Sequence, residues 1–212
     1  MRIIEQSATL LWVTPDPITA IERAARTCYK SEDKITADSA AKMVTALLKR
    51  GHEAMIEHAC ASIHVVTDRG ITHEFVRHRI ASFAQESTRY VNYASGKQDR
   101  QIGVVKPLGM TPEQEPIWLN ACEYAELFYM RMIDAGCPPE VARDVLPTCT
   151  KTELVITCNF REWRHFFKLR RNGTTGKPHP KMRALARLVW DSLIDQAGPA
   201  FADLAVETPP VV

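Results

Sequence analysis

Two short polar runs between residues 77 and 90 carry side chains that could do chemistry. Arg77, His78 and Arg79 are consecutive and have apolar residues on both sides, whereas a solvated charge run normally mixes signs. The run Ser87-Thr88-Arg89-Tyr90 combines short hydroxyl side chains with an arginine, which suits the binding of a phosphate or an oxyanion. Taken singly, the first run has a plain alternative as a helix C-terminus and the second as a polar turn. Their closeness favours one anion-binding site.

Residues 161–183 form a third, strongly basic segment. They contain eight Lys or Arg and one Glu, a charge of +7, so the rest of the chain sums to −5 for a net charge of +2. On a regular helix four residues would share one face: Trp163, Phe166, Phe167 and Arg170. The opposite face would carry Arg161, Arg164, His165 and Lys168. Arg170 would then be a cation on an apolar face, which must reach water or meet an anionic or polarisable partner.

The basic segment allows two interpretations. It is either a solvated basic face or a binding site for a phosphate-bearing ligand, such as a nucleotide or a nucleic acid. The near-balanced total charge argues against a protein that wraps nucleic acid over its whole surface.

Two other motif-like stretches lack the spacing that their chemistry needs. In GTTGKP (173–178) two residues separate the glycines where a phosphate-binding loop has four, and no Ser or Thr follows the lysine. His52 and His58 are six positions apart, so on a helix they would point to different sides and could not share a zinc ion. The six cysteines form no C-x-x-C pair, which favours reduced structural thiols. We therefore expect no metal site.

The composition is that of a globular protein. With 212 residues, 45% apolar and 25% charged, the chain can bury a core without disulfides. No apolar run approaches the roughly 18 residues of a membrane span. The N-terminal stretch contains Glu5 and no small-residue cleavage site after an apolar run, so we expect no signal peptide and a cytoplasmic location.

Helices and strands alternate without a regular rhythm, which predicts one α/β or α+β domain over residues 1–212. The expected strands are roughly 2–13 (stopped by Pro15 and Pro17), 60–67, 102–105 and 152–158. The expected helices begin at about 19, at 36 or 38 (ending at Gly51), at Thr72 (through Ile80), at 111 (ending at Gly136), at 138 (ending before Pro147), at 161 (through 170) and at 180 (through 198).

Arg77-His78-Arg79, followed after seven residues by Ser87, resembles the signature of the flavin-dependent thymidylate synthases, the ThyX family. Four further stretches are similar to family motifs: Gly51–His58, Ala142–Pro147, Asn159–Arg161 and Leu169-Arg170. The resemblance covers roughly residues 20–190 and implies a single domain with a central mixed or antiparallel sheet flanked by long helices.

The resemblance also implies roles for individual residues. The FAD contacts would be Glu57, Arg77, His78, Arg79, Ile80, Asn159, Arg161 and His165. The dUMP contacts would be Glu74, Arg77, Gln85, Ser87, Thr88, Arg89, Arg143 and Arg170. Arg170 would be catalytic, because a permanent cation beside the uracil ring favours the ionised, electron-rich pyrimidine. Ser87 has no base next to it in the sequence, so it would be a contact and not a nucleophile.

The implied reaction is the reductive methylation of dUMP. FAD reduced by NADPH would provide the hydride and methylenetetrahydrofolate the carbon, in a homotetramer whose flavin sites draw on several subunits. No cysteine lies in the motifs, which agrees with a mechanism without an enzyme thiolate. Two departures stand out: His165 replaces a common Asn, and residues 171–179 form a longer connection, in which His179 is a candidate flavin contact.

Two other functions stay open at this point. One is a nucleic-acid-binding module that uses residues 161–183, although the chain lacks an interleaved aromatic sheet motif. The other is a protein of the same fold that binds flavin or dUMP without turnover. Binding that weakens steeply with salt, without flavin uptake, would identify the first.

Overall fold

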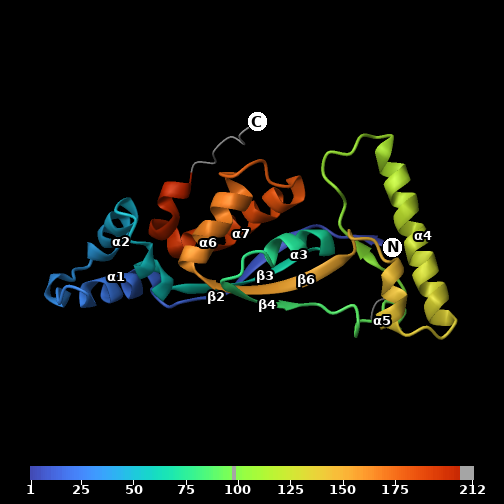
Figure 1. Cartoon of the computed structure of the whole chain (residues 1–212), viewed down its shortest axis with the longest axis horizontal. Helices are drawn as coiled ribbons and strands as arrows, with labels where there is room; N and C mark the ends of the chain where they lie inside the picture. Colours follow the sequence, from blue (N-terminus) through green and yellow to red (C-terminus); the bar gives the residue numbers. More distant parts are fainter. Residues whose placement is uncertain (97–98, 206–212) are drawn as a thin grey trace. The chain divides into compact units, whose positions relative to one another are not determined.

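The computed structural model describes residues 1–96 and 99–205. They divide into two compact units (Figure 1). Unit 1 comprises Met1–Ser7, Val66–Val76 and Ala84–Leu154, and unit 2 comprises Ala8–Val65, Arg77–Phe83 and the described residues from Val155 onward. The mixed helical and strand composition confirms the predicted fold class. Each unit contains a different part of the predicted site.

In residues 1–96 and 99–205, six strands form two sheets. The larger sheet has the order β2-β3-β6-β4, with bounds β2 Ser7–Val13, β3 Cys60–Asp68, β6 Lys151–Asn159 and β4 Ala81–Gln85. The smaller sheet is a parallel pair, β1 Arg2–Ile3 and β5 Gly103–Val104. Every second residue of β6 is buried, from Thr152 to Cys158, as a strand with one buried face requires. The strands predicted at 60–67, 102–105 and 152–158 are confirmed.

The single strand predicted over residues 2–13 is wrong, because two strands occupy this stretch. The amides of Arg2 and Ile4 donate to the carbonyls of Ile102 and Val104, which ties the first residues to β5. The second strand pairs with β3 instead. Local composition cannot distinguish these two partners, since both parts contain apolar residues that suit a strand.

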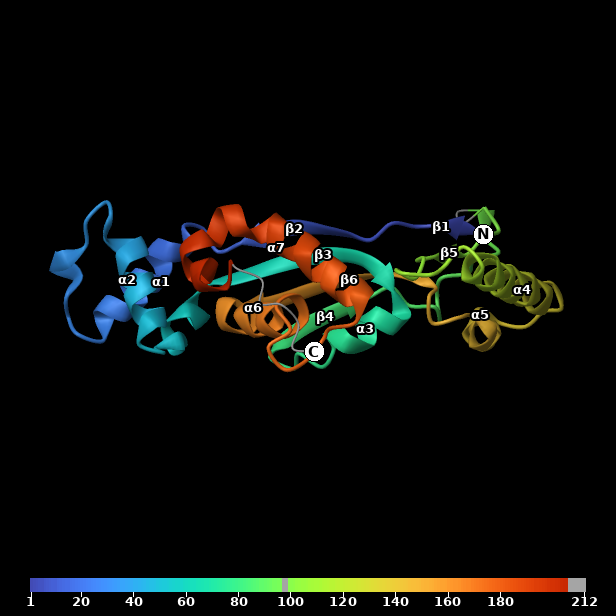
Figure 2. The same cartoon turned by 90° about the horizontal axis from the view of Figure 1, so that it is seen from above.

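Unit 2 builds its core around helices α6 and α7, which lie side by side in both views (Figure 2). Its helical elements are α1 Pro17–Thr27, η1 Glu32–Lys34, α2 Ser39–Lys49, η2 Glu53–His58, α6 Phe160–Phe166, the π-helical turn η5 Phe167–Arg171, α7 Pro180–Phe201 and η6 Ala202–Leu204. Five aromatic side chains pack against one another in this core: Trp163, Phe166, Phe167, Trp190 and Phe201. This cluster fixes α6, which carries three residues of the candidate site, Arg161, Glu162 and His165.

The helix predicted over 161–170 is confirmed in position, but its last turn is a π-turn. The amide of Asn172 donates to the carbonyl of Phe167 at 2.9 Å, the five-residue spacing of a π-helix. Such turns insert one residue into a helix and are frequent at functional sites. Phe167 and Arg171 are buried in the core, whereas Arg170 is half-buried.

Unit 1 packs a long helix against a small apolar core. Its helical elements are α3 Arg69–Phe75, α4 Gln114–Asp134, α5 Pro139–Ala142 and η4 Arg143–Val145. The core contains Tyr93, Ile102, Val104, Cys122 and Tyr129. Helix α4 ends close to the predicted Gly136, whose φ of +86° only glycine adopts without strain.

The helix predicted from Thr72 through Ile80 is wrong at both ends. Asp68, not Thr72, caps it, since the Asp68 carboxylate accepts a 2.8 Å hydrogen bond from the amide of Ile71. The helix α3 ends at Phe75, so Arg77, His78 and Arg79 belong to the connection between α3 and β4. None of the helices in the described residues has the length and hydropathy that a membrane-spanning segment requires.

Arg164 is a buried structural residue, so it belongs neither to a solvated basic face nor to a ligand-binding one, the two interpretations left open for this side of the helix. Its side chain is only 2% exposed. Both terminal nitrogens donate to the Asp203 carboxylate at 2.6 Å, and Nη1 also donates to the carbonyl of Ala200 at 2.7 Å. The guanidinium therefore ties α6 to the end of α7 and to η6.

Replacing Asp203 with alanine should lower the free energy of unfolding by about 2 kcal/mol. The loss removes both 2.6 Å hydrogen bonds to a carboxylate from a buried guanidinium. Glu53, 3.6 Å from Nε, and the carbonyl of Ala200 remain, and Asp203 itself is half exposed, so the cost is below that of breaking an isolated buried pair. Urea denaturation measures the change. The matched variant Asp195→Ala removes an exposed carboxylate of α7 and should cost less than about 0.5 kcal/mol. An equal loss in both variants would contradict the role of the Arg164 pair.

Candidate active site

A cavity of about 460 Å³ opens within unit 2. Five of the residues predicted to contact FAD line it: Glu57, Ile80, Asn159, Arg161 and His165. Three further residues line it that the sequence analysis did not single out for this site: Glu53, Glu162 and Lys168. The structure thus brings together residues from η2, from the connection before β4, and from the end of β6 with α6 and η5.

Asn159 sits at the junction of strand and helix. It is the last residue of β6 and caps α6, where its Oδ1 accepts a 3.0 Å hydrogen bond from the amide of Glu162. This bond satisfies one of the free amides at the start of the helix. The cap directs the first turn of α6, and with it Arg161 and Glu162, into the cavity.

Removing this cap with Asn159→Ala should lower the free energy of unfolding by about 1 kcal/mol. The conservative Asn159→Asp keeps an acceptor at the cap and should be close to the parent protein in thermal denaturation. If Asn159→Ala and Asn159→Asp lowered the melting temperature by the same amount, helix capping would not explain the presence of Asn159.

The wall of the cavity alternates charges of opposite sign. Arg161, which is about half exposed, donates from Nη1 to Glu57 at 2.6 Å, and Lys168 donates to Glu53 at 3.2 Å. Exposed pairs of this kind are worth little in stability and exchange readily with other partners. The cations can therefore turn to a phosphate and the carboxylates to hydroxyl groups of a ligand.

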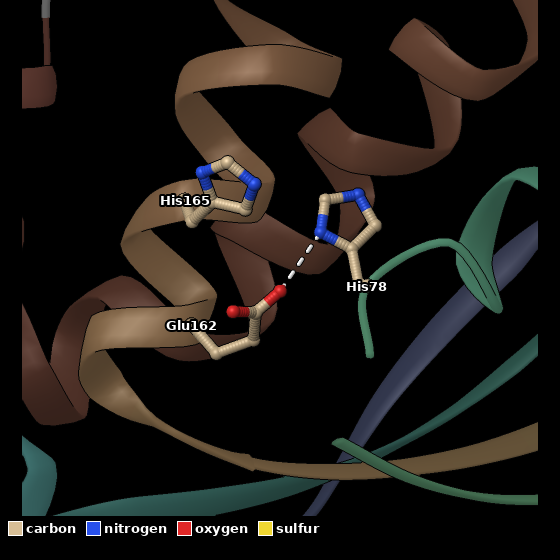
Figure 3. A group of neighbouring side chains, drawn as sticks. All are labelled: His78, Glu162 and His165. Atoms are coloured by element: carbon tan, nitrogen blue, oxygen red, sulfur yellow. Dashed lines mark hydrogen bonds and ion pairs between the residues drawn. The ribbon is translucent and has the colours of Figure 1, made fainter. Parts of the chain in front are cut away.

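His78 is the buried centre of the site, with 5% of its side chain exposed. Its Nδ1 lies 3.0 Å from Oε1 of Glu162, and its Nε2 accepts a 3.2 Å hydrogen bond from Nε of Arg170. The ring packs edge-on against Phe166 and His165, with centroids 5.3 and 5.5 Å away. Figure 3 shows that Glu162 and His165 come from one helix and that His78 approaches from a neighbouring loop.

The surroundings keep His78 neutral. Burial lowers the pKa of its imidazole from 6.5 to about 4, and the electrostatic interactions with Arg170 and His165 act in the same direction. Burial raises the pKa of the Glu162 carboxyl, which His165 partly offsets. The contact between His78 and Glu162 is therefore a hydrogen bond to a neutral ring and not an ion pair with a charged one.

The ligand atoms of His78, Glu162 and His165 lie within 4.8 Å of one another, close enough to hold a metal ion. No such cluster was expected from the spacing of histidines and cysteines in the sequence. The Glu-x-x-His spacing of Glu162 and His165 on one helix was the signal that could have found it. Two imidazoles and a carboxylate suit zinc or iron, but Arg170 places a guanidinium on the other nitrogen of His78.

The residues predicted to bind dUMP lie mostly in unit 1. Gln85 Nε2 donates to Oγ1 of Thr72 at 3.0 Å, which fixes its amide at the end of β4. Ser87 Oγ accepts from the amide of Arg89 at 3.2 Å in the turn that follows. These contacts define the shape of the turn, and neither of them involves the guanidinium group of Arg89.

Two arginines flank this turn. Arg89 Nε donates to Glu140 at 2.9 Å in an exposed pair, and Arg143 Nη1 contacts the hydroxyl of the buried Thr88 at 3.4 Å.

Glu74 lies half-buried on α3 in the same unit. The two remaining predicted contacts, Arg77 and Arg79, are exposed and belong to unit 2. His179, the other candidate flavin contact, caps α7 by accepting from the amide of Lys181 at 3.2 Å.

The basic segment 161–183 does not form one continuous charged surface. Three of its cations are buried: Arg164, Arg171 and Lys181. Arg171 lies over the ring of Trp190 at 4.1 Å and donates to the carbonyl of Leu204 at 3.1 Å. This distribution argues against the nucleic-acid-binding alternative, which needs those charges at the surface.

Comparison with known proteins agrees with this picture. The family described as "Thymidylate synthase complementing protein" (Thy1) matches residues 9–198. A flavin-dependent thymidylate synthase of Geobacter sulfurreducens is 34% identical over 168 residues, which cover 76% of this chain and 72% of the relative.

Two solved structures share the fold. The UMP/dUMP methylase PolB of Streptomyces cacaoi, bound with 5-Br dUMP, gives a TM-score of 0.81 at 23% identity and covers 96% of this chain and 97% of its own. Thymidylate Synthase X of Helicobacter pylori, with FAD and dUMP, gives 0.77 at 20% identity over 94% and 99%. The match over residues 9–198 places the chain in the Thy1 family of thymidylate synthase complementing proteins.

Proposed function

We propose that the protein is a flavin-dependent thymidylate synthase that converts dUMP to dTMP by reductive methylation. The observation that carries the proposal is the contact between His78 and Arg170, which lie 92 positions apart. It joins the Arg-His-Arg signature to the arginine expected to act on the substrate. Family membership and the name of the Geobacter sulfurreducens relative support the same activity.

The cavity suits part of an FAD molecule. Its volume of about 460 Å³ lies in the range of small-molecule sites but is smaller than a whole dinucleotide. Arg161 and Lys168 offer cations for the pyrophosphate, Glu57 an acceptor for ribose hydroxyls, and the exposed Ile80 an apolar surface for a ring. Arg77, His78, Arg79, Asn159 and His165 are the other proposed flavin contacts. When bound and reduced by NADPH, FAD supplies the hydride.

The missing part of such a site would come from other subunits. We propose a homotetramer, supported by the exposed apolar side chains of α4: Ile117, Tyr124, Leu127 and Phe128. Apolar groups gathered on one exposed helix are typical of an interface. We also propose a single catalytic domain over residues 1–212 and a cytoplasmic location.

For dUMP we propose the turn after β4 as the phosphate cradle. Ser87, Thr88 and Arg89 would hold the phosphate with Arg143 and Arg77, while Gln85 and Glu74 would contact the nucleoside. Binding of the phosphate would exchange the exposed Arg89–Glu140 pair for a charge-assisted bond. Arg170 would face the uracil ring, where its charge stabilises the negative charge that develops as C5 becomes nucleophilic. Methylenetetrahydrofolate would supply the carbon.

Replacing Ser87 with alanine should raise KM for dUMP about tenfold, because one hydrogen bond to a charged group is lost. Turnover at saturating dUMP should persist, since Ser87 is a contact. Steady-state kinetics separate the two effects, and Ser192→Ala, a helical serine of α7, is the control. A covalent adduct between Ser87 and the nucleotide in mass spectrometry would contradict this role.

NADPH oxidation by the FAD-loaded protein, with and without dUMP, tests the proposed function. Stimulation by dUMP, followed by dTMP formation once methylenetetrahydrofolate is added, is the expected result. UMP belongs in the same experiment, because the neighbour PolB is a UMP/dUMP methylase. A yellow protein without stimulation would indicate binding without turnover, and a protein that takes up no FAD would contradict the proposal.

A further inference from the structure

We propose that Glu162 is a positioning residue that orients Arg170 through the imidazole of His78. The chain of contacts runs from the Glu162 carboxylate to Nδ1 of His78 at 3.0 Å, and from Nε2 of His78 to Nε of Arg170 at 3.2 Å. The role of Arg170 in this inference rests on the proposed function, whereas the chain of hydrogen bonds does not.

The donor and acceptor inventory fixes the tautomer of His78. A guanidinium can only donate, so Nε2 of His78 must accept from Arg170 and carries no proton. The neutral ring then carries its proton on Nδ1, which faces Glu162. A carboxylate that accepts this proton favours the one tautomer able to receive the arginine.

Burial makes the arrangement rigid. His78 and Glu162 are each less than 10% exposed, and the imidazole ring packs edge-on against Phe166 and His165. Glu162 lies in α6 and Arg170 in the π-turn that follows it, so one short segment supplies both ends of the chain of contacts. An arginine on a long flexible stem gains most from such support, because a fixed guanidinium loses less entropy when it meets a ligand.

The same tautomer excludes a metal ion on His78, Glu162 and His165. A metal on Nδ1 would need the lone pair of that nitrogen while Nε2 still accepts from Arg170. The ring would then have to be an imidazolate beside a guanidinium. The chain of hydrogen bonds and a bound metal are therefore alternatives, and the contact at Nε2 favours the former.

The tautomer can be read directly by NMR. The flavin-free protein is labelled with ¹⁵N-histidine, and the His78 signals are assigned by their loss in His78→Asn. At pH 7 we expect Nδ1 protonated and Nε2 unprotonated. In Glu162→Gln, which keeps the size of the side chain but not its charge, part of the population should shift to the Nε2–H tautomer. A wild-type ring protonated on Nε2, or stoichiometric metal in the purified protein, would overturn the proposal without any variant.

Kinetics test the consequence for Arg170. Glu162→Gln should lower kcat about tenfold while KM for dUMP changes less than about threefold, as expected when a supporting residue is removed from a group that acts in the transition state. The control Asp195→Asn should leave both constants unchanged. If the parent protein is active and Glu162→Gln changes neither the tautomer of His78 nor kcat, the inference about Glu162 is wrong while the proposed function stands. A parent without dUMP-dependent activity would instead contradict the proposed function.

Discussion

Replacing Arg170 with alanine should lower dUMP-dependent turnover at least about a hundredfold, while FAD affinity changes less than about threefold. Removal of one preorganised charge from a reacting centre typically costs two to three orders of magnitude in kcat. Arg170 does not line the cavity proposed for the flavin, so its loss should spare that site. Steady-state NADPH oxidation gives turnover, and flavin fluorescence titration gives the affinity.

Two further variants separate charge from geometry at this position. Arg170→Lys keeps the positive charge but loses the planar guanidinium and its Nε donor to His78, so most of the loss should remain. Arg187→Ala removes an exposed arginine of α7 and should leave turnover unchanged. Turnover within threefold of the parent in Arg170→Ala would remove Arg170 from the chemistry.

The elements with strong local signals could be predicted from the sequence. β3 and β6 are rich in β-branched residues, and α4 is bounded by residues near Thr111 and Gly136. The errors arose where contacts with distant parts of the chain determine the secondary structure. The split of residues 2–13 depends on pairing with residues 102–104, and the cap of α3 depends on which of Asp68 and Thr72 reaches the first free amide.

The candidate site shows the same division. The Arg-His-Arg run and Arg170 stand out by residue type. Of the two outcomes left open for Arg170, reaching water or meeting a partner, the structure shows a partner, His78. The role of Glu162 could not be predicted, because its partner lies 84 positions away and a lone Glu in a basic segment looks like a counter-charge. Arg164 was misplaced for a related reason, since only the fold shows that Asp203 lies beside it.

Acidification should weaken the folded state through His78. The folded pKa of about 4 lies below the ordinary 6.5, so the unfolded chain binds a proton at this ring that the folded protein rejects. The stability that the neutral ring contributes is fully present above pH 6.5 and is lost as the pH falls towards 4. The difference between these two pKa values of His78 corresponds to about 3 kcal/mol of folding stability, because one pKa unit equals about 1.36 kcal/mol.

Comparison with His78→Asn isolates this contribution. Glu162 has the opposite sign, because its raised pKa makes the folded state the better proton binder as the pH falls. The pKa shift of Glu162 is caused by burial and by His165, and both are still present in His78→Asn. The contribution of Glu162 is therefore the same in both proteins and cancels when their free energies of unfolding are subtracted. Urea denaturation from pH 7 to 4 should show the stability gap between the parent and His78→Asn narrowing by about 3 kcal/mol, mostly between pH 6.5 and 4. A gap that stays constant with pH would show that His78 is not held neutral by its surroundings.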